Sequence, residues 1–356
     1  MEQAGLRTGI WIIATGVIVT ALYLGRSIFA PFAIAVFLWL VMESFSRKIN
    51  RAISILPEWA SRVIGIIIVL TGFGLVLVLL GQGIEDISAR AGDYESRINE
   101  LIAEGYSLLG LRDAPTFSAI VFGETGQRFI GSIASATSKL SENLVIVLIY
   151  IAFLFMAASN WSEKLDAIFR DPDHRAQVRE ISADMVDGIE GYLWTQTVIS
   201  ALITVLTYIT LLIFGVQNAL LLCVLIFILN YIPTVGSILA AFVPLVFAIA
   251  QPEWPAYMPE STMISAGLVF LGVSFWQFLI GNFVQPRIMG DTLNLSTLVV
   301  LLSLAVWGAL WGIPGMFLSA PLTVIIMIVC NQFSSTKWFA ILLSADGKPG
   351  RMEVAD

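Results

Sequence analysis

The chain carries little charge for its length. Of its 356 residues only 13% are Asp, Glu, Lys or Arg, whereas 58% are hydrophobic, and the mean hydropathy is +0.87. A soluble domain has roughly twice that fraction of charged residues, so the composition predicts a polytopic membrane protein. The formal net charge is −7 and the sequence has no basic run. Both features argue against nucleic acid as a partner.

Residues that build metal, redox and catalytic sites are also scarce. The two cysteines, Cys223 and Cys330, lie inside apolar runs and are interpreted as small hydrophobic residues. The single histidine, His174, has no Cys or second His at ligand spacing, so we do not expect a zinc site. The sequence has no Gly-x-x-x-x-Gly-Lys loop for ATP and no pairing of a nucleophile with a base. We therefore expect neither an enzyme nor a resident cofactor, with Na⁺ coupling left open.

Two long apolar runs, residues 219–250 and 298–329, are the most informative features present. Each is too long for one simple span of about twenty residues. Each is interrupted near its centre by residues that break a helix, and a proline recurs after each break. The breaks and the prolines that follow them comprise Asn230, Pro233, Thr234, Gly236 and Pro244 in the first run, and Gly312, Pro314, Gly315 and Pro321 in the second.

These paired breaks favour a transport site. Two Gly/Pro-interrupted hydrophobic segments at corresponding positions are the best sequence indication of a transporter's binding site. Unwound backbone is tolerated at membrane depth only where it is buried in protein or lines a polar cavity. We therefore expect two re-entrant helical hairpins. The alternative is a pair of long helices kinked at proline, whose neighbours satisfy the freed backbone groups.

The other apolar segments predict an all-α protein with about six full spans besides the two broken hairpins, which makes eight hydrophobic segments. Basic residues after the second span place the N-terminus in the cytoplasm, and Lys337, Lys348 and Arg351 place the C-terminus there too. The expected division is spans one to three in 1–82, an exterior (periplasmic) helical hairpin in 83–143, span four in 144–158, cytoplasmic amphipathic helices in 159–190, a transport core in 191–336 and a cytoplasmic tail in 337–356.

The exterior hairpin is expected from a heptad seam, which can pair within the subunit or between subunits. Its apolar positions are Ile84, Ile87, Ala91, Tyr94, Ile98 and Leu101, and then Phe129, Ile133, Ala136 and Leu140.

Loop charges predict opposite orientations for the two broken runs. The loop 251–260 has no Lys or Arg and is rich in aromatic residues, so it is interpreted as external, and the first run would enter and leave on the exterior face. The second run lies between Arg287 and Lys337 and would enter and leave from the cytoplasm. That arrangement is an inverted repeat. If both runs instead cross once, the chain has eight spans, and only the side of the 251–260 loop separates the two topologies.

Several motifs along the chain carry a family resemblance. They are Gly191-Tyr-Leu-Trp-Thr-Gln196, Asn230-Tyr-Ile-Pro-Thr-Val-Gly236 with Pro244, Asn282-Phe-Val-Gln-Pro-Arg-Ile-Met-Gly290, and the segment from Leu295 through Gly308, Gly312 and Gly315 to Ala320-Pro321-Leu322. Together they resemble the autoinducer-2 exporter family of permeases, over nearly the whole chain. The resemblance implies a bacterial inner-membrane transporter with re-entrant hairpins, which forms a homo-oligomer, a pentamer, and works by an elevator-like movement.

The chain departs from the family pattern at two places. Trp194-Thr195 stands where a basic residue is common before Gln196, and Gly281 stands where an acidic residue often precedes Asn282. Both departures leave the coupling ion and the substrate open.

The uncharged lining of the broken segments limits the substrate. Residues 191–252, 261–286 and 292–336 contain no Asp, Glu, Lys, Arg or His, and intramembrane charges usually mark proton relays. The polar groups that remain suit a small neutral polyol or hydroxy-ketone, or Na⁺ held by carbonyl oxygens. For each amide the alternative is a helix–helix hydrogen bond worth about 0.6 kcal/mol. These candidates, with the proline beside them, are Gln196, Asn230, Thr234, Asn282, Gln285 and Pro286.

Three functions are compatible with these features. The first is a secondary exporter of a small polar metabolite, autoinducer-2-like as the family implies, with the lipid bilayer and further copies of the chain as partners. The second is a Na⁺/H⁺ antiporter that uses Asp187, Glu190 or Asp291. These acids lie at predicted cytoplasmic ends, where solvent should hold their pKa values near the ordinary range. The third is a non-transporting scaffold whose exterior hairpin binds a partner. The paired breaks favour transport.

Overall fold

The computed structural model describes residues 2–53, 55–108, 144–158, 161–169, 171–289 and 294–349, with a few single positions between 110 and 119. Across these ranges the chain is helical, and its one β feature is an isolated bridge between Leu295 and Ser344. The chain forms two compact units. Unit 1 comprises Met1–Arg62, Asn143–Leu193 and Asp291–Asp356, and unit 2 comprises Val63–Glu142 and Trp194–Gly290. The expected transport core, residues 191–336, contributes to both.

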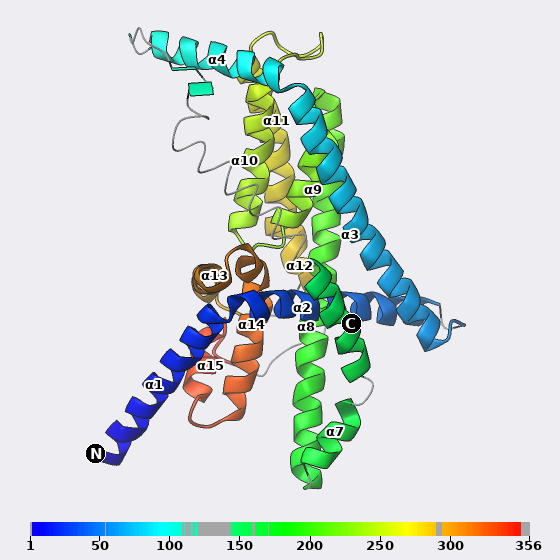
Figure 1. Cartoon of the computed structure of the whole chain (residues 1–356), viewed down its shortest axis with the longest axis vertical. Coiled ribbons are helices and arrows are strands. Elements are labelled where there is room, and N and C mark those ends of the chain that lie inside the picture. Colours follow the sequence, from blue (N-terminus) through cyan, green and yellow to red (C-terminus); the bar gives the residue numbers. More distant parts are fainter. Residues whose placement is uncertain are drawn as a thin grey trace. The chain divides into compact units, whose positions relative to one another are not determined.

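Unit 1 is built around aromatic packing. In unit 1, Phe37 of α2 meets Phe317 of α14 edge to face, with ring centroids 4.9 Å apart. The indole N–H of Trp311 donates to the carbonyl of Leu22 at 3.1 Å, which attaches α13 to α1. The helices of unit 1 are α1 (Glu2–Leu24), α2 (Arg26–Ala52), α7 (Trp161–Ile168), α13 (Thr297–Trp311), α14 (Ile313–Gln332), α15 (Lys337–Leu343) and the first part of α8 (Pro172–Phe214), besides a helix at 144–158 (Figure 1).

Unit 2 has an apolar core to which α8, α9 and α11 contribute. Leu211, Leu222, Val269 and Val273 are almost fully buried in it. Figure 1 shows α10 and α11 running side by side, and the two helices pack on each other. The helices of unit 2 are the remainder of α8, most of α3 (Glu58–Ala89), α4 (Ala91–Leu108), α9 (Ala219–Leu229), α10 (Val235–Ala250), α11 (Thr262–Leu279), the π-helical turn η1 (Ile280–Val284) and α12 (Gln285–Met289).

Apolar helices dominate both units. Within the described ranges, five helices are long and apolar enough to cross a membrane, namely α2, α3, α8, the helix over Thr262–Ile288, and α14. Shorter apolar helices cover 13–24, 144–158, 219–229, 235–250 and 297–311. The prediction of an all-α protein with several apolar helices is therefore confirmed for the described residues. The number of full spans and the division of the chain stay predictions.

The predicted exterior hairpin is described only in its first half. Its buried seam residue Tyr94, on α4, donates from its hydroxyl to Gln217 Oε1 at 3.4 Å and accepts from Asn218 Nδ2 at 3.2 Å. Arg97, one turn further along, donates to the Thr262 hydroxyl at the start of α11. These bonds attach α4 to the loop before α9 and to the start of α11. The second half of the seam, Phe129, Ile133, Ala136 and Leu140, lies outside the described residues.

The first broken run folds back on itself, and we call α9, its break and α10 the first hairpin (residues 219–250). The backbone N–H of Gln217 donates to Gln251 Oε1 at 2.9 Å, and Gln251 Nε2 donates to the carbonyl of Gly215 at 3.1 Å. A continuous helix would hold Gln217 and Gln251 about 50 Å apart, at 1.5 Å per residue. The chain therefore reverses between α9 and α10, and the side chain of Gln251 closes the base of the hairpin.

The second broken run also reverses, and we call α13, its break and α14 the second hairpin (residues 297–332). The indole N–H of Trp307 donates to Thr323 Oγ1 at 3.3 Å, although these residues would lie about 24 Å apart on one straight helix. Beyond the hairpin the chain returns to its start. The backbone N–H of Ser296 donates to the carbonyl of Leu343 at 3.0 Å, next to the bridge between Leu295 and Ser344.

Candidate functional site

Two glutamine side chains, one from α8 and one from α11, meet Asn230 at the break of the first hairpin. Gln196 on α8 donates from Nε2 to the backbone carbonyl of Asn230 at 2.6 Å. Gln277 on α11 donates from Nε2 to Asn230 Oδ1 at 3.3 Å. Gln196, Asn230 and Gln277 are 5%, 8% and 9% exposed, so this amide cluster is shielded from solvent by unit 2 itself.

Asn230 leaves one buried donor unused. Its backbone N–H donates to the carbonyl of Ile226 at 3.0 Å, and its two oxygens accept from Gln196 and Gln277. Its Nδ2 is buried and has no hydrogen-bond partner. A buried polar group without a partner destabilises a protein by about 1–3 kcal/mol. The buried Nδ2 group of Asn230 therefore destabilises the break, and the packing of the helices gives no reason for its presence.

The next residues of the break are also held by α8. Thr197 Oγ1 and the hydroxyl of Tyr231 lie 2.7 Å apart within hydrogen-bonding distance, and Tyr231 is 8% exposed. Its ring packs edge-on against Phe227, one turn earlier. Consecutive residues of α8, Gln196 and Thr197, thus fix consecutive residues of the break, Asn230 and Tyr231.

The tip of the first hairpin is tight and strained. Thr234 has a φ of 58°, a left-handed value that is unusual for a β-branched residue. Such strained residues cluster at functional sites. Thr234 is exposed, and its hydroxyl donates to the carbonyl of Pro233 at 2.7 Å. A Cβ on Gly236 would collide with the carbonyl of Leu229, so the reversal requires glycine there.

The other candidates in unit 2 lie apart from these amide contacts. Asn282 lies in the π-helical turn and donates from Nδ2 to the carbonyl of Phe278 at 2.9 Å, on its own helix. Gln285 is half-buried and Pro286 is exposed, both at the start of α12. Pro244 is buried within α10. The structure therefore brings together Gln196 and Asn230 and adds Gln277, which the sequence analysis did not single out.

The break of the second hairpin, in unit 1, has an aromatic environment. Gly312 has a φ of 68°, and a Cβ on Gly315 would collide with the carbonyl of Trp307. Pro314 is half-buried at the second position of α14. Pro321 is buried and lines an apolar groove of about 280 Å³ together with Trp311 and aromatic residues of α2. Tryptophan side chains of α13 thus lie beside this break, whereas carboxamide side chains lie at the break of the first hairpin.

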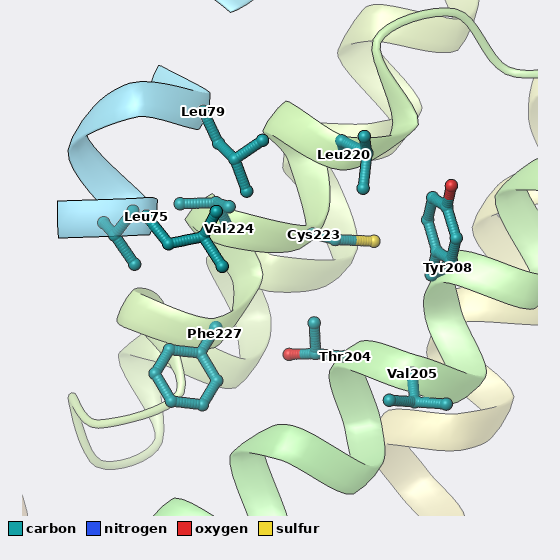
Figure 2. Close-up of a pocket in the computed structure, with 10 residues that line it drawn as sticks. Leu75, Leu79, Thr204, Val205, Tyr208, Leu220, Cys223, Val224 and Phe227 are labelled. Atoms are coloured by element: carbon teal, nitrogen blue, oxygen red, sulfur yellow. The ribbon is translucent and has the colours of Figure 1, made fainter. Parts of the chain in front are cut away.

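A second groove, of about 240 Å³, lies in unit 2 among α3, α8 and α9. Figure 2 shows Cys223 pointing toward Tyr208, with Thr204 close by and aliphatic side chains of α3 on the opposite wall. The lining is apolar apart from the Thr204 and Tyr208 hydroxyls and the Cys223 thiol. A polar metabolite would find few hydrogen-bond partners there, so the amide cluster is the better candidate for its site.

The prediction that solvent surrounds Glu190 is wrong. Glu190 lies in the polar first part of α8, before the apolar stretch that begins at Tyr192, and is only 6% exposed. Arg47 of α2 contacts it at 2.5 Å and contacts Asp187 at 2.9 Å. Burial raises the pKa of Glu190 to about 7, a shift that Arg47 opposes and that Glu43 and Asp187 reinforce. The burial of Glu190 removes the solvent that was expected to hold its pKa near the ordinary value.

Asp187, the second of the three acids considered for antiport, is exposed. Its side chain is 56% exposed, as expected for a residue at the cytoplasmic surface. Asp291 lies outside the described residues.

Comparison with known proteins shows similarity to membrane transporters. The sequence model of the family described as AI-2E family transporter matches residues 12–335. The AI-2 transport protein TqsA of Escherichia coli is 27% identical over 350 residues, which are 96% of this chain and 96% of that protein. The sodium-lithium/proton antiporter of Halobacillus andaensis is 26% identical over 212 residues, which are 59% of this chain and 57% of that protein.

Proposed function

The chain belongs to the AI-2E transporter family, and on this premise we propose that it is a secondary transporter that exports a small uncharged polar metabolite across the bacterial inner membrane. The relative TqsA is named for AI-2 transport, so an autoinducer-2-like molecule is the first substrate to test. The proposal places the substrate at the break of the first hairpin.

The amide cluster is the observation that carries the proposal. Gln196, Asn230 and Gln277 lie in stretches that contain no charged residue, in helices apolar enough to lie in a bilayer. Polar groups at such depth are expensive and typically mark a substrate path. A scaffold needs neither a broken helix nor an unpaired amide there, so the cluster argues for transport over a structural role.

We further propose that both hairpins are re-entrant. The 11 residues of α9 and the 16 residues of α10 span about 17 and 24 Å, whereas the hydrocarbon core is about 30 Å thick. The closed base at Gln251 supports entry and exit on one face. For the second hairpin, the pairing of Leu295 with Ser344 beyond α15 supports the same arrangement. Loop charges favour the exterior face for the first hairpin and the cytoplasmic face for the second.

The remaining parts of the proposal come from the family. We propose a homo-oligomer, a pentamer, in which the hairpins carry the substrate by an elevator-like movement, with both chain termini in the cytoplasm.

Transport in proteoliposomes tests the proposal. We expect the protein to carry autoinducer-2, and we expect Asn230→Leu and Gln196→Leu to lose most of that activity at unchanged protein level. Gln332→Leu, which makes the same kind of change at an exposed position at the end of α14, is the control and should transport normally. Full activity of both cluster variants would refute the placement of the site.

Cation–proton exchange is the second candidate, and the buried Glu190 favours it. A carboxyl with a pKa of about 7, paired with Arg47, has the properties of a proton carrier, and one relative is named as a sodium-lithium/proton antiporter. Antiport predicts that an imposed pH gradient drives Na⁺ movement and that Glu190→Gln abolishes it. Metabolite export without antiport predicts neither result.

A further inference from the structure

The unused donor of Asn230 has a defined direction because Gln277 fixes the carboxamide. A carboxamide has an acceptor end and a donor end, and the Gln277 N–H occupies the acceptor end of Asn230 at 3.3 Å. The donor end, Nδ2, is then left buried and unpaired. Asn230 is 8% exposed, so bulk water does not satisfy this donor.

Four carbonyls of the break already accept hydrogen bonds. Gly236 N donates to the carbonyl of Ile232 at 3.0 Å, Val235 N to that of Pro233 at 2.6 Å, and Ile238 N to that of Thr234 at 3.3 Å. The carbonyl of Asn230 accepts from Gln196 at 2.6 Å. A Na⁺ ion bound by unwound carbonyls would have to compete with these donors, whereas the unpaired group in the break is itself a donor.

The charge around the cluster further limits the ligand. An unpaired N–H group can donate a hydrogen bond either to an anion or to a neutral oxygen. Residues 191–252 and 261–286 contain no Lys, Arg or His, and an anion transferred into an uncharged, buried site without a cationic partner is strongly disfavoured. A neutral oxygen, of a carbonyl or a hydroxyl group, is the partner that remains.

We infer that Asn230 binds the substrate by donating its Nδ2–H to a neutral carbonyl or hydroxyl oxygen, and that Gln277 is the positioning residue that keeps this donor turned toward the ligand. This inference rests on the proposed function and adds a substrate class to it, namely a neutral oxygen-bearing molecule and not Na⁺. Without the Gln277 N–H, the carboxamide of Asn230 can rotate and offer its oxygen, so the site loses its preference for an acceptor.

Ligand-dependent thermal stabilisation of the purified full-length protein in lipid nanodiscs tests the inference. The neutral probes are 1,3-dihydroxyacetone and a set of three- to five-carbon hydroxy-ketones and polyols, and NaCl is compared with choline chloride at equal concentration. We expect at least one neutral probe to stabilise the wild type, and NaCl to act no differently from choline chloride. The concentration for half-maximal stabilisation should rise about tenfold in Asn230→Ala, as loss of one good hydrogen bond predicts.

Gln277→Leu separates positioning from simple support of the fold. It keeps the Asn230 side chain, so we expect weaker stabilisation by the neutral probe together with a newly measurable advantage of NaCl over choline chloride, because the Asn230 oxygen is then free. A merely structural role would lower the unfolding temperature without changing this preference. Gln332→Leu is the control for an amide replaced elsewhere.

The inference fails if no neutral probe stabilises the wild type. It also fails if Asn230→Ala and Gln277→Leu both bind the probe as the wild type does, or if Na⁺ stabilises the wild type through Asn230. Transport measurements distinguish this failure from that of the proposed function. Transport of autoinducer-2 with unchanged apparent affinity in Asn230→Ala and Gln277→Leu would leave the protein a transporter and refute only the assigned contact.

Discussion

Replacing Glu190 by glutamine should flatten the pH dependence of the protein's stability between about pH 4.5 and 7. The carboxyl of Glu190 is buried, and its pKa rises from 4.5 to about 7. The folded protein therefore holds this proton to a higher pH than the unfolded chain does. The stabilisation from Glu190 is fully present below pH 4.5 and is lost as the pH rises through 7.

The size of the effect follows from the raised pKa. One pKa unit corresponds to about 1.4 kcal/mol, so the free energy of unfolding should fall by roughly 3–4 kcal/mol between pH 4.5 and pH 7. Glutamine resembles the protonated carboxyl and does not titrate, so the variant should lack this slope.

Thermal unfolding of the detergent-purified protein, measured from pH 4.5 to 8, provides the assay. The midpoint of the wild type should decline relative to that of Glu190→Gln by a few degrees as the pH rises. Glu180→Gln is the control, because Glu180 lies on the same helix α8 with an exposed side chain, and its profile should follow the wild type. Parallel profiles of wild type and Glu190→Gln would refute the assignment of a buried, titrating carboxyl.

Three further predictions concern the first hairpin and the topology. Gly236→Ala should destabilise the protein by about 2 kcal/mol or more and abolish transport, because the new Cβ meets a backbone carbonyl. Gly267 has open space around it, so Gly267→Ala should show neither effect in the same unfolding and transport assays. Gln251→Ala removes three hydrogen bonds and should speed amide hydrogen exchange in α9 and α10; exchange at the wild-type rate would show that the base does not depend on this side chain. A cysteine replacing Tyr257, which is 68% exposed, should react with an impermeant reagent in intact cells, and one replacing Trp338, which is 66% exposed, only after permeabilisation. The reverse pattern would overturn the proposed orientation.

Much of the fold is predictable from hydropathy and helix breakers. The apolar runs predict the helices, and Pro233, Gly236 and Gly312 mark the breaks, because proline and glycine act through the local backbone and need no knowledge of distant contacts. The reversal at the first break is harder to predict. It depends on a polar side chain, Gln251, that meets residues more than thirty positions earlier, and no local pattern specifies such a contact.

The site was predictable in part, for the same physical reason. Asn230 is conspicuous because it lies at a break, and Gln196 because it belongs to a motif. Gln277 is a single amide in an apolar helix, which by itself equally indicates a helix–helix hydrogen bond. Only the packing of α11 against the break gives it a partner. Glu190 was misjudged because a charged residue near a helix end is usually solvated, and its burial depends on the packing of neighbouring segments.

The closed base of the first hairpin has a consequence for how the chain enters the membrane during synthesis. With 11 residues, α9 is too short to be stable as a span on its own. Gln251, which closes the base through Gln217 and Gly215, is synthesised only after α10 is complete. On the proposed topology, α9 cannot therefore be released into lipid as it emerges from the insertion machinery. It must be retained until α10 follows, and the two helices must leave together as a preassembled pair.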